Sequence, residues 1–407
     1  MLLITGARLG RMFGHRRLFL IGLALFTAAS LACGLAAGIG QLIIFRLVQG
    51  AGAALLVPQV LSLIQLTFDG AGRARAFSVY STVLAGASVT GQILGGVLTS
   101  ADIAGTGWRP VFLVNVPLGL ALLAVASRLL PADRSGTAPR GLDMPGLLTL
   151  SPTVLLLVVP LVLGHEWGWP AWGWAMLAAG VVFFAVFVRT QRRSAAPLVP
   201  GAVLRAPGLV LAAASIFLMM AGWGGFLFTM ALYLQNGLGL SPMQAGLAFV
   251  LPSLAFGMAS LNWRRVPARF HRVLIPAGLV LSALGHVLVA VIAADGSAGV
   301  IYQLGAIMSG VGMGAAFSPA LNAALAHVAP ADAANASGLM STITQLGQVV
   351  GVAALGAVFL SLAPLAASPT LAAAGTATNI AVAALVLMSA GCAAVRRPAV
   401  AASHSDG

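Results

Sequence analysis

The sequence predicts an all-α integral membrane protein, and two properties of the chain support this prediction. Hydrophobic residues make up 60% of the chain and charged residues only 7%, whereas about a quarter of the residues in a soluble domain are charged. Apolar runs of about 20 residues also recur along the whole chain. Each run is long enough to cross the roughly 30 Å hydrocarbon core of a bilayer as a helix.

We expect about twelve membrane-spanning helices, each bounded by a short polar or glycine-rich connection. In order, they cover residues 18–38, 41–66, 77–99, 110–130, 144–164, 172–190, 208–235, 243–261, 273–294, 298–325, 334–361 and 375–395. The two longest polar connections, Pro131 to Asp143 and Arg189 to Pro207, divide the spans into groups of four, two and six. The sequence therefore predicts an incomplete N-terminal helical bundle at 1–130, two inserted linker helices at 131–207, a C-terminal six-helix bundle at 208–398 and a disordered tail at 399–407.

The basic residues predict the orientation of the chain. All 21 are arginines, and apart from Arg46 and Arg109 they lie before the first span or after an even-numbered one. Membrane proteins concentrate arginine in cytoplasmic loops, so we expect a multi-pass protein of the inner (plasma) membrane with a cytoplasmic C-terminus. This pattern explains the net charge of +13, which would otherwise also fit nucleic-acid binding. The expected partner is the lipid bilayer and not nucleic acid, and the oligomeric state stays open, a monomer included.

Residues suited to metal, nucleotide or hydrolytic chemistry are not grouped as an enzyme requires. Six histidines and two cysteines are scattered without the spacing of metal ligands. Cys33 and Cys392 fall in separate apolar spans, which does not fit a disulfide framework. A Walker-type phosphate loop needs lysine, which the chain lacks. We therefore expect no catalytic residues, no metal and no cofactor.

The segment from Gly6 to Arg17 combines glycines with a cluster of arginines. Glycine permits tight turns, and arginine bonds the carbonyls at a helix end or a carboxylate on a neighbouring helix. We expect a cytoplasmic loop, which is either a plain positively charged connection or a specific conformational element. Its candidate functional residues are Gly6, Gly10, Arg11, Gly14, Arg16 and Arg17.

Further motifs follow this segment in a characteristic order. Residues 42–52 carry Arg46 in the body of a span, and residues 86–96 form a glycine-rich stretch. Three further short motifs lie at residues 107–117, 233–246 and 337–347. Together with residues 6–17 they resemble the motifs of the major facilitator superfamily, in particular its fourteen-helix drug:proton antiporter branch. The similarity covers essentially the whole chain.

This resemblance implies a major facilitator fold, with two pseudo-symmetric helical bundles, a two-helix insertion between them, and transport by alternating access. It also identifies an antiporter motif at Gly91, Gln92, Gly95 and Gly96, where small residues allow two helices to pack closely. Gln92 stands where proline is usual in the family. Arg11 stands where the family carries an acidic residue thought to lock the segment to neighbouring helices, which calls normal conformational switching into question.

Arg46 is the predicted transport residue. An unpaired arginine in the body of a span is costly, so such residues face a bundle interior or water and mark transport pathways. The resemblance implies a part for Arg46 in proton coupling. The alternative is that the side chain extends to the nearby membrane interface.

Polar and aromatic residues within the spans are candidates for a substrate pocket. They are Gln59, Trp223, Phe226, Asn322 and Gln345. A surface rich in aromatic residues and methionine suits a loose pocket for apolar or cationic compounds, although the uncharged polar residues also serve as contacts between helices. His286 lies in the middle of a span, where it either titrates or stays a neutral core residue.

None of the predicted spans contains an acidic residue, whereas proton-coupled exporters need a titratable group within the membrane. By resemblance, this acid belongs to the first family helix, which we expect to be missing from this chain together with most of the second. Two hypotheses follow. The chain is a secondary active transporter that exports drugs or hydrophobic or cationic metabolites in exchange for protons, or it is an N-terminally truncated, transport-incompetent membrane remnant or scaffold.

Overall fold

In the computed structural model, the described residues are 2–101, 105–133, 143–164, 168–194, 197, 201, 208–295, 299–326, 328, 332–363 and 368–394. Within these ranges the chain is helical and forms no strand, which confirms the predicted all-α fold. The first part of the chain comprises α1 (Leu2–Phe13), α2 (His15–Gly34), α3 (Ile39–Thr67), α4 (Gly70–Ser100), α5 (Pro110–Leu113), α6 (Asn115–Leu129), α7 (Met144–Leu163) and α8 (Ala171–Arg193). The second comprises α10 (Leu209–Leu232) with the π turn Tyr233–Gly237, α11 (Pro242–Ala248), α12 (Val250–Asn262), α13 (His271–Ala294), α14 (Val300–Leu325), α15 (Ala333–Leu362) and α16 (Ser368–Ala394).

Each predicted span falls on one helix or on two consecutive helical pieces. By length and composition, 10 helices of the described part are long and apolar enough to cross a membrane. The two predicted spans outside that group are α4, which is rich in glycine, serine and threonine, and α7, whose apolar stretch is shorter. The chain is therefore a multi-pass membrane protein.

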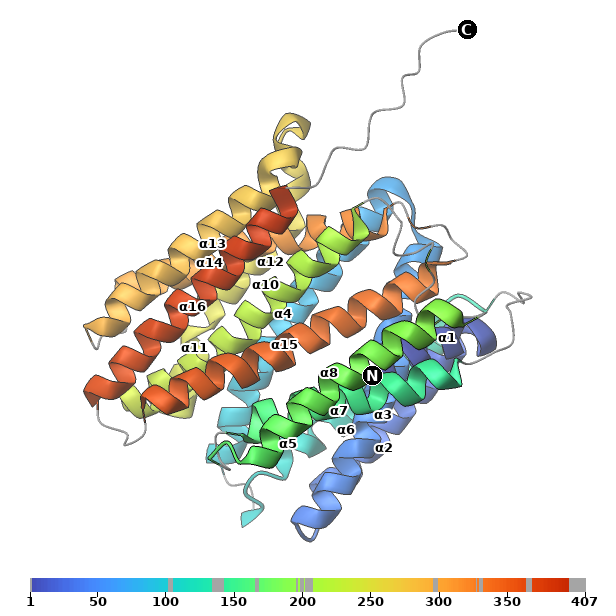
Figure 1. Cartoon of the computed structure of the whole chain (residues 1–407), viewed down its shortest axis with the longest axis horizontal. Helices are drawn as coiled ribbons and strands as arrows, with labels where there is room; N and C mark the ends of the chain where they lie inside the picture. The colour runs from blue at the N-terminus through green and yellow to red at the C-terminus, as the bar shows by residue number, and fades with distance from the viewer. Residues whose placement is uncertain are drawn as a thin grey trace, which may run out of the picture.

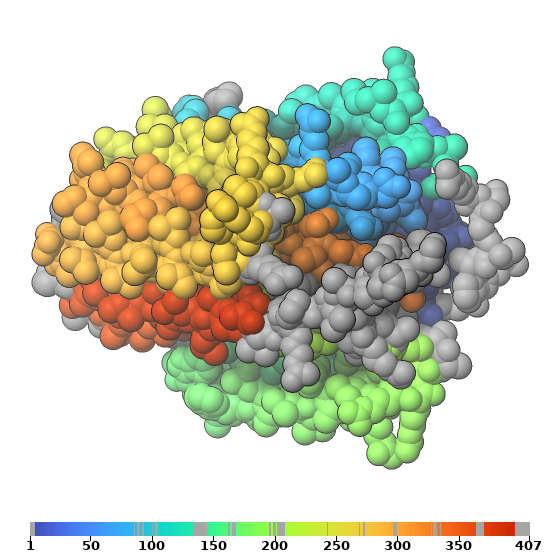
Figure 2. Space-filling model, turned by 90° about the horizontal axis from the view of Figure 1, so that it is seen from above, coloured from blue at the N-terminus to red at the C-terminus, as the bar shows by residue number. Residues whose placement is uncertain are grey.

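The helices lie side by side in two groups (Figure 1). α10 to α16 form one group, in which α13 packs on α14 and α16, and α10 packs on α15. α1, α2, α3 and α6 form the other, and the pair α7–α8 lies along the outside of the molecule against α15, at the lower edge of Figure 2. Although α4 belongs to the first part of the sequence, it packs mainly on α11, α12 and α14.

The buried core belongs mainly to the C-terminal helices. Its largest fully buried side chains include Tyr233, Tyr302 and Phe317, whereas the first part of the described chain contributes only Leu61 and Phe77 to the main cluster. A separate small cluster around Leu150 joins α7 to α8. The α7–α8 pair therefore has its own minor core.

The segment from Gly6 to Arg17 is not the loop that the sequence predicted. Helix α1 continues to Phe13, and the chain breaks only at Gly14, whose φ of 99° lies in the left-handed region that favours glycine. Gly6 and Gly10 lie within α1, where an added Cβ would come 2.2 Å from the carbonyl oxygen of Ala54 and 2.0 Å from Oε1 of Gln59. These two glycines allow α1 to approach α3 closely, a long-range function that the local sequence does not distinguish from a turn.

Candidate functional site

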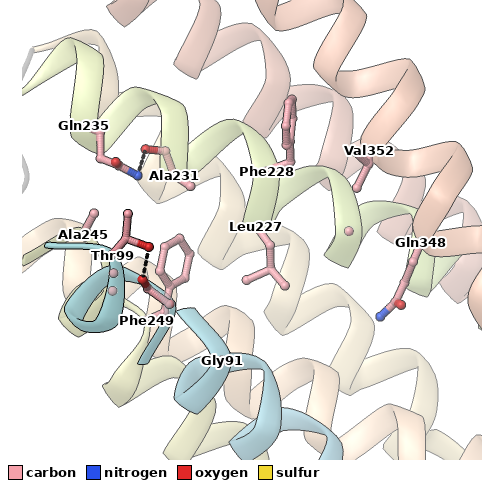
Figure 3. Close-up of a pocket in the computed structure, with 14 residues that line it drawn as sticks. Gly91, Thr99, Leu227, Phe228, Ala231, Gln235, Ala245, Phe249, Gln348 and Val352 are labelled. Atoms are coloured by element: carbon pink, nitrogen blue, oxygen red, sulfur yellow. Dashed lines mark hydrogen bonds between the residues drawn. The ribbon is translucent and has the colours of Figure 1, made fainter. Parts of the chain in front are cut away.

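Two adjoining cavities lie where α4 faces the C-terminal helices. The larger, about 730 Å³, is lined by α4, α10, α11 and α15 (Figure 3). The smaller, about 370 Å³, is lined by α3, α4, α10, α12, α14 and α15. Gln348 of α15 lines both cavities, so the two are neighbours along the same interface. Their volumes are in the range of small-molecule sites.

The wall that α4 contributes to the larger cavity contains Gly91, Gly95, Gly96 and Thr99. The close helix packing predicted at this motif is not found at Gly91 or Gly95, because a Cβ there would meet no atom within 4 Å. Leu227 extends from α10 toward this wall in Figure 3. Glycine therefore keeps the cavity open at these positions instead of bringing two helices together.

The smaller cavity has an aromatic wall. The ring of Trp223 lies 6.2 Å from that of Phe256, and Phe256 lies 6.2 Å from Phe317, measured between centroids. These three rings come from α10, α12 and α14 and line the cavity together with Tyr80 of α4. Aromatic side chains at such separations form a broad apolar surface that binds planar groups.

The polar groups that line the cavities are uncharged. They are the amides of Gln235, Gln345 and Gln348 and the hydroxyls of Tyr80, Thr99, Ser341 and Thr344. Amides and hydroxyls donate and accept hydrogen bonds without carrying charge. The arrangement therefore fits an aromatic or aliphatic compound with carbonyl and hydroxyl groups better than an ion, which would lack a counter-charge.

The structure brings together only part of the predicted pocket. Trp223 and Gln345 line the smaller cavity, whereas Phe226 packs behind Trp223 and is 1% exposed. Asn322 lies on α14 outside the lining of either cavity. Gln59 was predicted in the pocket but lines neither cavity. Its Nε2 donates to the carbonyl oxygen of Gly6 at 2.7 Å, and its Oε1 lies 2.7 Å from Nδ1 of His15. The Gln59 side chain therefore joins α1, α2 and α3.

The prediction missed Gln348, Tyr80 and Phe256. Gln348 was detectable, since it follows Gln345 by three residues and both amides therefore lie on one face of α15. The aromatic residues carried no such signal. In a membrane protein an aromatic side chain in a span is equally compatible with lipid, core and cavity.

Arg46 lies on α3 and lines neither cavity. Its Nη1 donates to Oε1 of Gln49 at 2.6 Å, and Nε2 of Gln49 donates to Oγ of Ser30 on α2 at 2.6 Å. Its guanidinium carbon also lies 5.6 Å from the ring centroid of Phe112 on α5. Arg46 thus belongs to a polar chain that joins α2, α3 and α5.

Hydrogen bonds from α3 and α4 to the C-terminal helices gather at the end where α3 stops and α4 begins. Oγ of Ser337 on α15 donates to Oε1 of Gln65 at 2.8 Å, and Nε1 of Trp263 donates to Oγ of Ser78 at 3.0 Å. The hydroxyl of Ser81 lies 3.2 Å from that of Ser318. We call these contacts the closed end. Thr99 and Gln235, which line the larger cavity, lie near the opposite ends of α4 and α10.

Asp133 holds the start of α2. Its carboxylate accepts hydrogen bonds from the backbone N–H groups of Arg16, at 2.9 Å, and Arg17, at 3.1 Å. The Arg16 guanidinium donates to the carbonyl oxygen of Ser127 near the end of α6. A Cβ at Gly14 would come 2.1 Å from the Asp133 carboxylate, so this close approach requires glycine. A carboxylate at a helix N-terminus binds its free N–H groups and complements its dipole.

A second carboxylate reaches the same region from the start of α7. Asp143, 5% exposed, accepts from the backbone N–H of Gly146 at 3.0 Å and from Nε2 of Gln191 on α8 at 2.5 Å. Burial lowers the pKa of the Arg8 guanidinium on α1, the charge of Arg11 lowers it further, and the Asp143 carboxylate acts in the opposite direction. Carboxylates from the α6–α7 connection thus lie beside the arginine-rich segment.

Two groups of membrane-spanning helices with cavities at their interface define the architecture of a membrane transporter. The chain belongs to the Major Facilitator Superfamily, whose family model matches residues 1–193, 144–352 and 212–405. This match confirms the predicted family and its fold, and it agrees with the prediction that the protein is not an enzyme.

Several relatives are named as transport, export or resistance proteins for antibiotics. The probable actinorhodin transporter of Streptomyces coelicolor is 37% identical over 369 residues, covering 89% of this chain and 64% of the relative. The cephamycin export protein CmcT of Amycolatopsis lactamdurans is 37% identical over 87% of this chain and 73% of the relative. The tetracenomycin C resistance and export protein of Streptomyces glaucescens is 32% identical over 88% of this chain and 66% of the relative. The chain therefore spans about two thirds of the length of these relatives.

Solved structures share the fold. The human organic anion transporter MFSD10 superposes with a TM-score of 0.68 over 96% of this chain and 80% of that one, at 16% identity. The Escherichia coli fucose:proton symporter FucP superposes with a TM-score of 0.59 over 97% of this chain and 87% of that one, at 12% identity. At such low identity these likenesses concern the fold alone.

Proposed function

We propose that the protein exports antibiotic-like, hydrophobic small molecules across the inner membrane by alternating access, in exchange for protons. The observation that carries this proposal is the pair of cavities between α4 and the C-terminal helices, with an aromatic wall and uncharged polar groups. The relatives named as exporters of actinorhodin, cephamycin and tetracenomycin C support the same class of substrate. Because none of the described residues that line the cavities is charged, uncharged aromatic compounds fit them better than organic cations.

Alternating access requires the two helix groups to separate at one end while they close at the other. In the proposed orientation the arginine-rich connections are cytoplasmic, so the closed end formed by Gln65, Ser78, Ser81 and their partners faces the cytoplasm. The larger cavity then lies toward the outside. This arrangement suits release of substrate outward, and rupture of a few hydrogen bonds at this end, including the one from the Arg264 guanidinium to the carbonyl oxygen of Ala71, would admit the next molecule.

Arg46 is the proposed polar element of coupling outside the cavities. Its chain through Gln49 and Ser30 joins α2 to α3, so a change in its charge environment would move the helices that flank the closed end. Arg46→Ala is expected to abolish export while membrane insertion stays intact. Arg109→Ala is the matched control, because the Arg109 guanidinium donates to the backbone carbonyl of Ala36 and stacks on Trp108. Full export by the Arg46→Ala variant would remove Arg46 from the mechanism.

The proposed function is tested with the full chain in a bacterial host that lacks its own drug exporters. The probes are radiolabelled chloramphenicol and tetracenomycin C, which are uncharged and aromatic, and tetraphenylphosphonium, a cation of comparable size. We expect lower steady-state accumulation of the uncharged probes than in cells with empty vector, and a smaller effect on the cation. Unchanged accumulation of all probes, with the protein present in the membrane, would favour the transport-incompetent alternative.

A further inference from the structure

His286 is a buried titratable side chain that the proposed transport cycle has not yet used. It lies near the middle of α13 and is 1% exposed. The acidic residues of the described part, by contrast, all lie at helix ends or in a connection: Asp69, Asp133, Asp143, Asp295 and Asp332. A proton-coupled carrier needs a group within the membrane that binds and releases a proton. His286, unlike these carboxylates, lies within a membrane-spanning helix.

The side chains around His286 are uncharged, and the four described below come from four different helices. Its Nε2 lies 2.8 Å from Oγ of Ser309 on α14, which in turn lies 3.4 Å from Oγ of Ser282 on α13. Asn379 of α16 is a further polar side chain next to the imidazole. The ring of Phe226 on α10 stacks edge-on against the imidazole at a centroid distance of 4.8 Å.

Two polar atoms of this cluster have no hydrogen-bond partner. They are Nδ1 of His286 and Oδ1 of Asn379, although the amide nitrogen of Asn379 donates to the carbonyl oxygen of Gly375 at 2.9 Å and lies 3.2 Å from Sδ of Met230. Buried polar atoms are nearly always paired, and an exception calls for a functional explanation. The unpaired nitrogen and the unpaired oxygen are complementary once the nitrogen carries a proton.

The cluster can satisfy the imidazole in both of its charge states. A neutral imidazole has one donor and one acceptor, whereas an imidazolium has two donors. A serine hydroxyl donates or accepts, so Ser309 can reverse its hydrogen bond to Nε2 and turn its own proton toward Ser282. Oδ1 of Asn379 is then a free acceptor for the proton on Nδ1. The other titratable side chains of the described core, or packed against it, are the phenols of Tyr80, Tyr233 and Tyr302.

A charged imidazole without a counter-charge is unfavourable in closed apolar packing. Protonation of His286 would therefore favour a conformation in which water reaches the cluster, and loss of the proton would favour the closed packing seen here. The ring of Phe226 also lies 6.2 Å from that of Trp223, which lines the smaller cavity. A change in packing around His286 thus has a short, contiguous route to the wall of the cavity.

We infer that His286 is the proton-binding residue of the C-terminal helices, with Ser282, Ser309 and Asn379 as the partners that accommodate both charge states. The inference rests on the proposed export function and assigns its coupling step to one residue. In each cycle one proton from the outside binds to the imidazole, and the same proton leaves to the cytoplasm, so that its downhill movement drives one substrate outward.

The test uses the full chain in proteoliposomes and radiolabelled chloramphenicol as the probe. Two activities are compared: exchange of labelled for unlabelled probe at equal pH on both sides, and uphill transport driven by an imposed pH gradient. For His286→Gln and His286→Asn we expect exchange to persist and gradient-driven transport to be lost, together with the pH dependence of the exchange rate. His271→Gln is the matched control, because His271 begins the same helix and bonds the carbonyl oxygen of Val266.

Each outcome decides between the hypotheses. Gradient-driven transport by both His286 variants would overturn the inference, and so would loss of exchange in both, which indicates a purely structural role. Wild-type protein that exchanges the probe but ignores the gradient would overturn the inference and leave export standing. If wild type exchanges no probe, the export proposal fails. The nitrogen NMR signal of His286, identified by its absence from His286→Gln in bilayers, then decides separately: we expect it to change from neutral to charged when the pH is lowered, and a signal that stays neutral down to the pH at which the protein unfolds would overturn the inference.

Discussion

The most buried spans lie among the C-terminal helices and the least buried among the N-terminal ones, although all are apolar. The buried share of the most apolar stretch is 72% in α10 and 56% in α14, but 11% in α8 and 6% in the span formed by α5 and α6, while α2 at 44% and α15 at 33% show that the two ranges overlap. Among the 10 apolar spans of the described part, α14 is the least apolar and one of the most buried. Hydropathy thus identifies a span but not its place, because lipid is as apolar as a protein interior and small residues, not large apolar ones, mark the packed faces.

Glycine residues also differ in what surrounds them: some lie against the backbone of a neighbouring helix, and others line a cavity. Between α13 and α14, Cβ atoms at Gly285 and Gly312 would come 2.5 and 2.3 Å from backbone carbonyl oxygens, so these positions require the absence of a side chain. At Gly91 and Gly95 of α4 the space beside the backbone is empty. In the C-terminal group glycine brings helices together, and at the interface with α4 it leaves room for a ligand.

The largest effect is expected where glycine packs against a backbone. At Gly351 of α15 a Cβ would lie 1.9 Å from the carbonyl oxygen of Ala221 on α10, so Gly351→Ala must force these helices apart at a cost of about 1–3 kcal/mol or more. We expect a large loss of monodisperse protein after detergent extraction and a lower melting temperature. Gly95→Ala is the matched control and should leave both unchanged. Equal losses in the two variants would break the distinction between packing and cavity glycines.

An intermediate effect is expected within the cavity. Trp223→Ala and Gln348→Ala remove an aromatic wall and a shared amide, and loss of about 0.5–1.5 kcal/mol of contact energy predicts a roughly twofold to tenfold weaker apparent affinity for chloramphenicol. The measurement is the concentration dependence of exchange in proteoliposomes. Gln59→Ala, which breaks the contact between α1 and α3, should lower stability without changing this affinity. The reverse pattern would move the ligand site toward α1.

The smallest effect is expected at the start of α2. Asp133→Ala removes the acceptor for the N–H groups of Arg16 and Arg17, which should destabilise this helix end by about 1 kcal/mol. Faster hydrogen exchange of these two amides is the readout. Asp69→Ala serves as the control, since Asp69 precedes α4 without a side-chain hydrogen bond to the helix. Similar changes in exchange at both helix ends would show that the carboxylate has no specific function at α2.

Prediction from sequence succeeded where the signal is local. The predicted spans and the absence of strands follow from apolar runs, and the family follows from short motifs in a fixed order. Trp223 and Gln345 were placed in the pocket, but Gln59 was not distinguished from them, because a buried amide looks the same whether it binds a ligand or the carbonyl oxygen of Gly6. The segment from Gly6 to Arg17 was predicted as a loop for a similar reason, since glycine serves both turns and close helix contacts.

The sequence by itself determined that the chain crosses the membrane many times, where its helices run and to which family it belongs, because length, hydropathy and motif order are properties of contiguous residues. Only the tertiary structure decided which face of each helix is buried, that α4 packs on the C-terminal helices, and that Asp133 and Asp143 lie beside the arginine-rich segment. These features depend on contacts between residues far apart in the chain. In an apolar solvent no periodic pattern of hydrophobic residues distinguishes the inner face of a helix from the outer one.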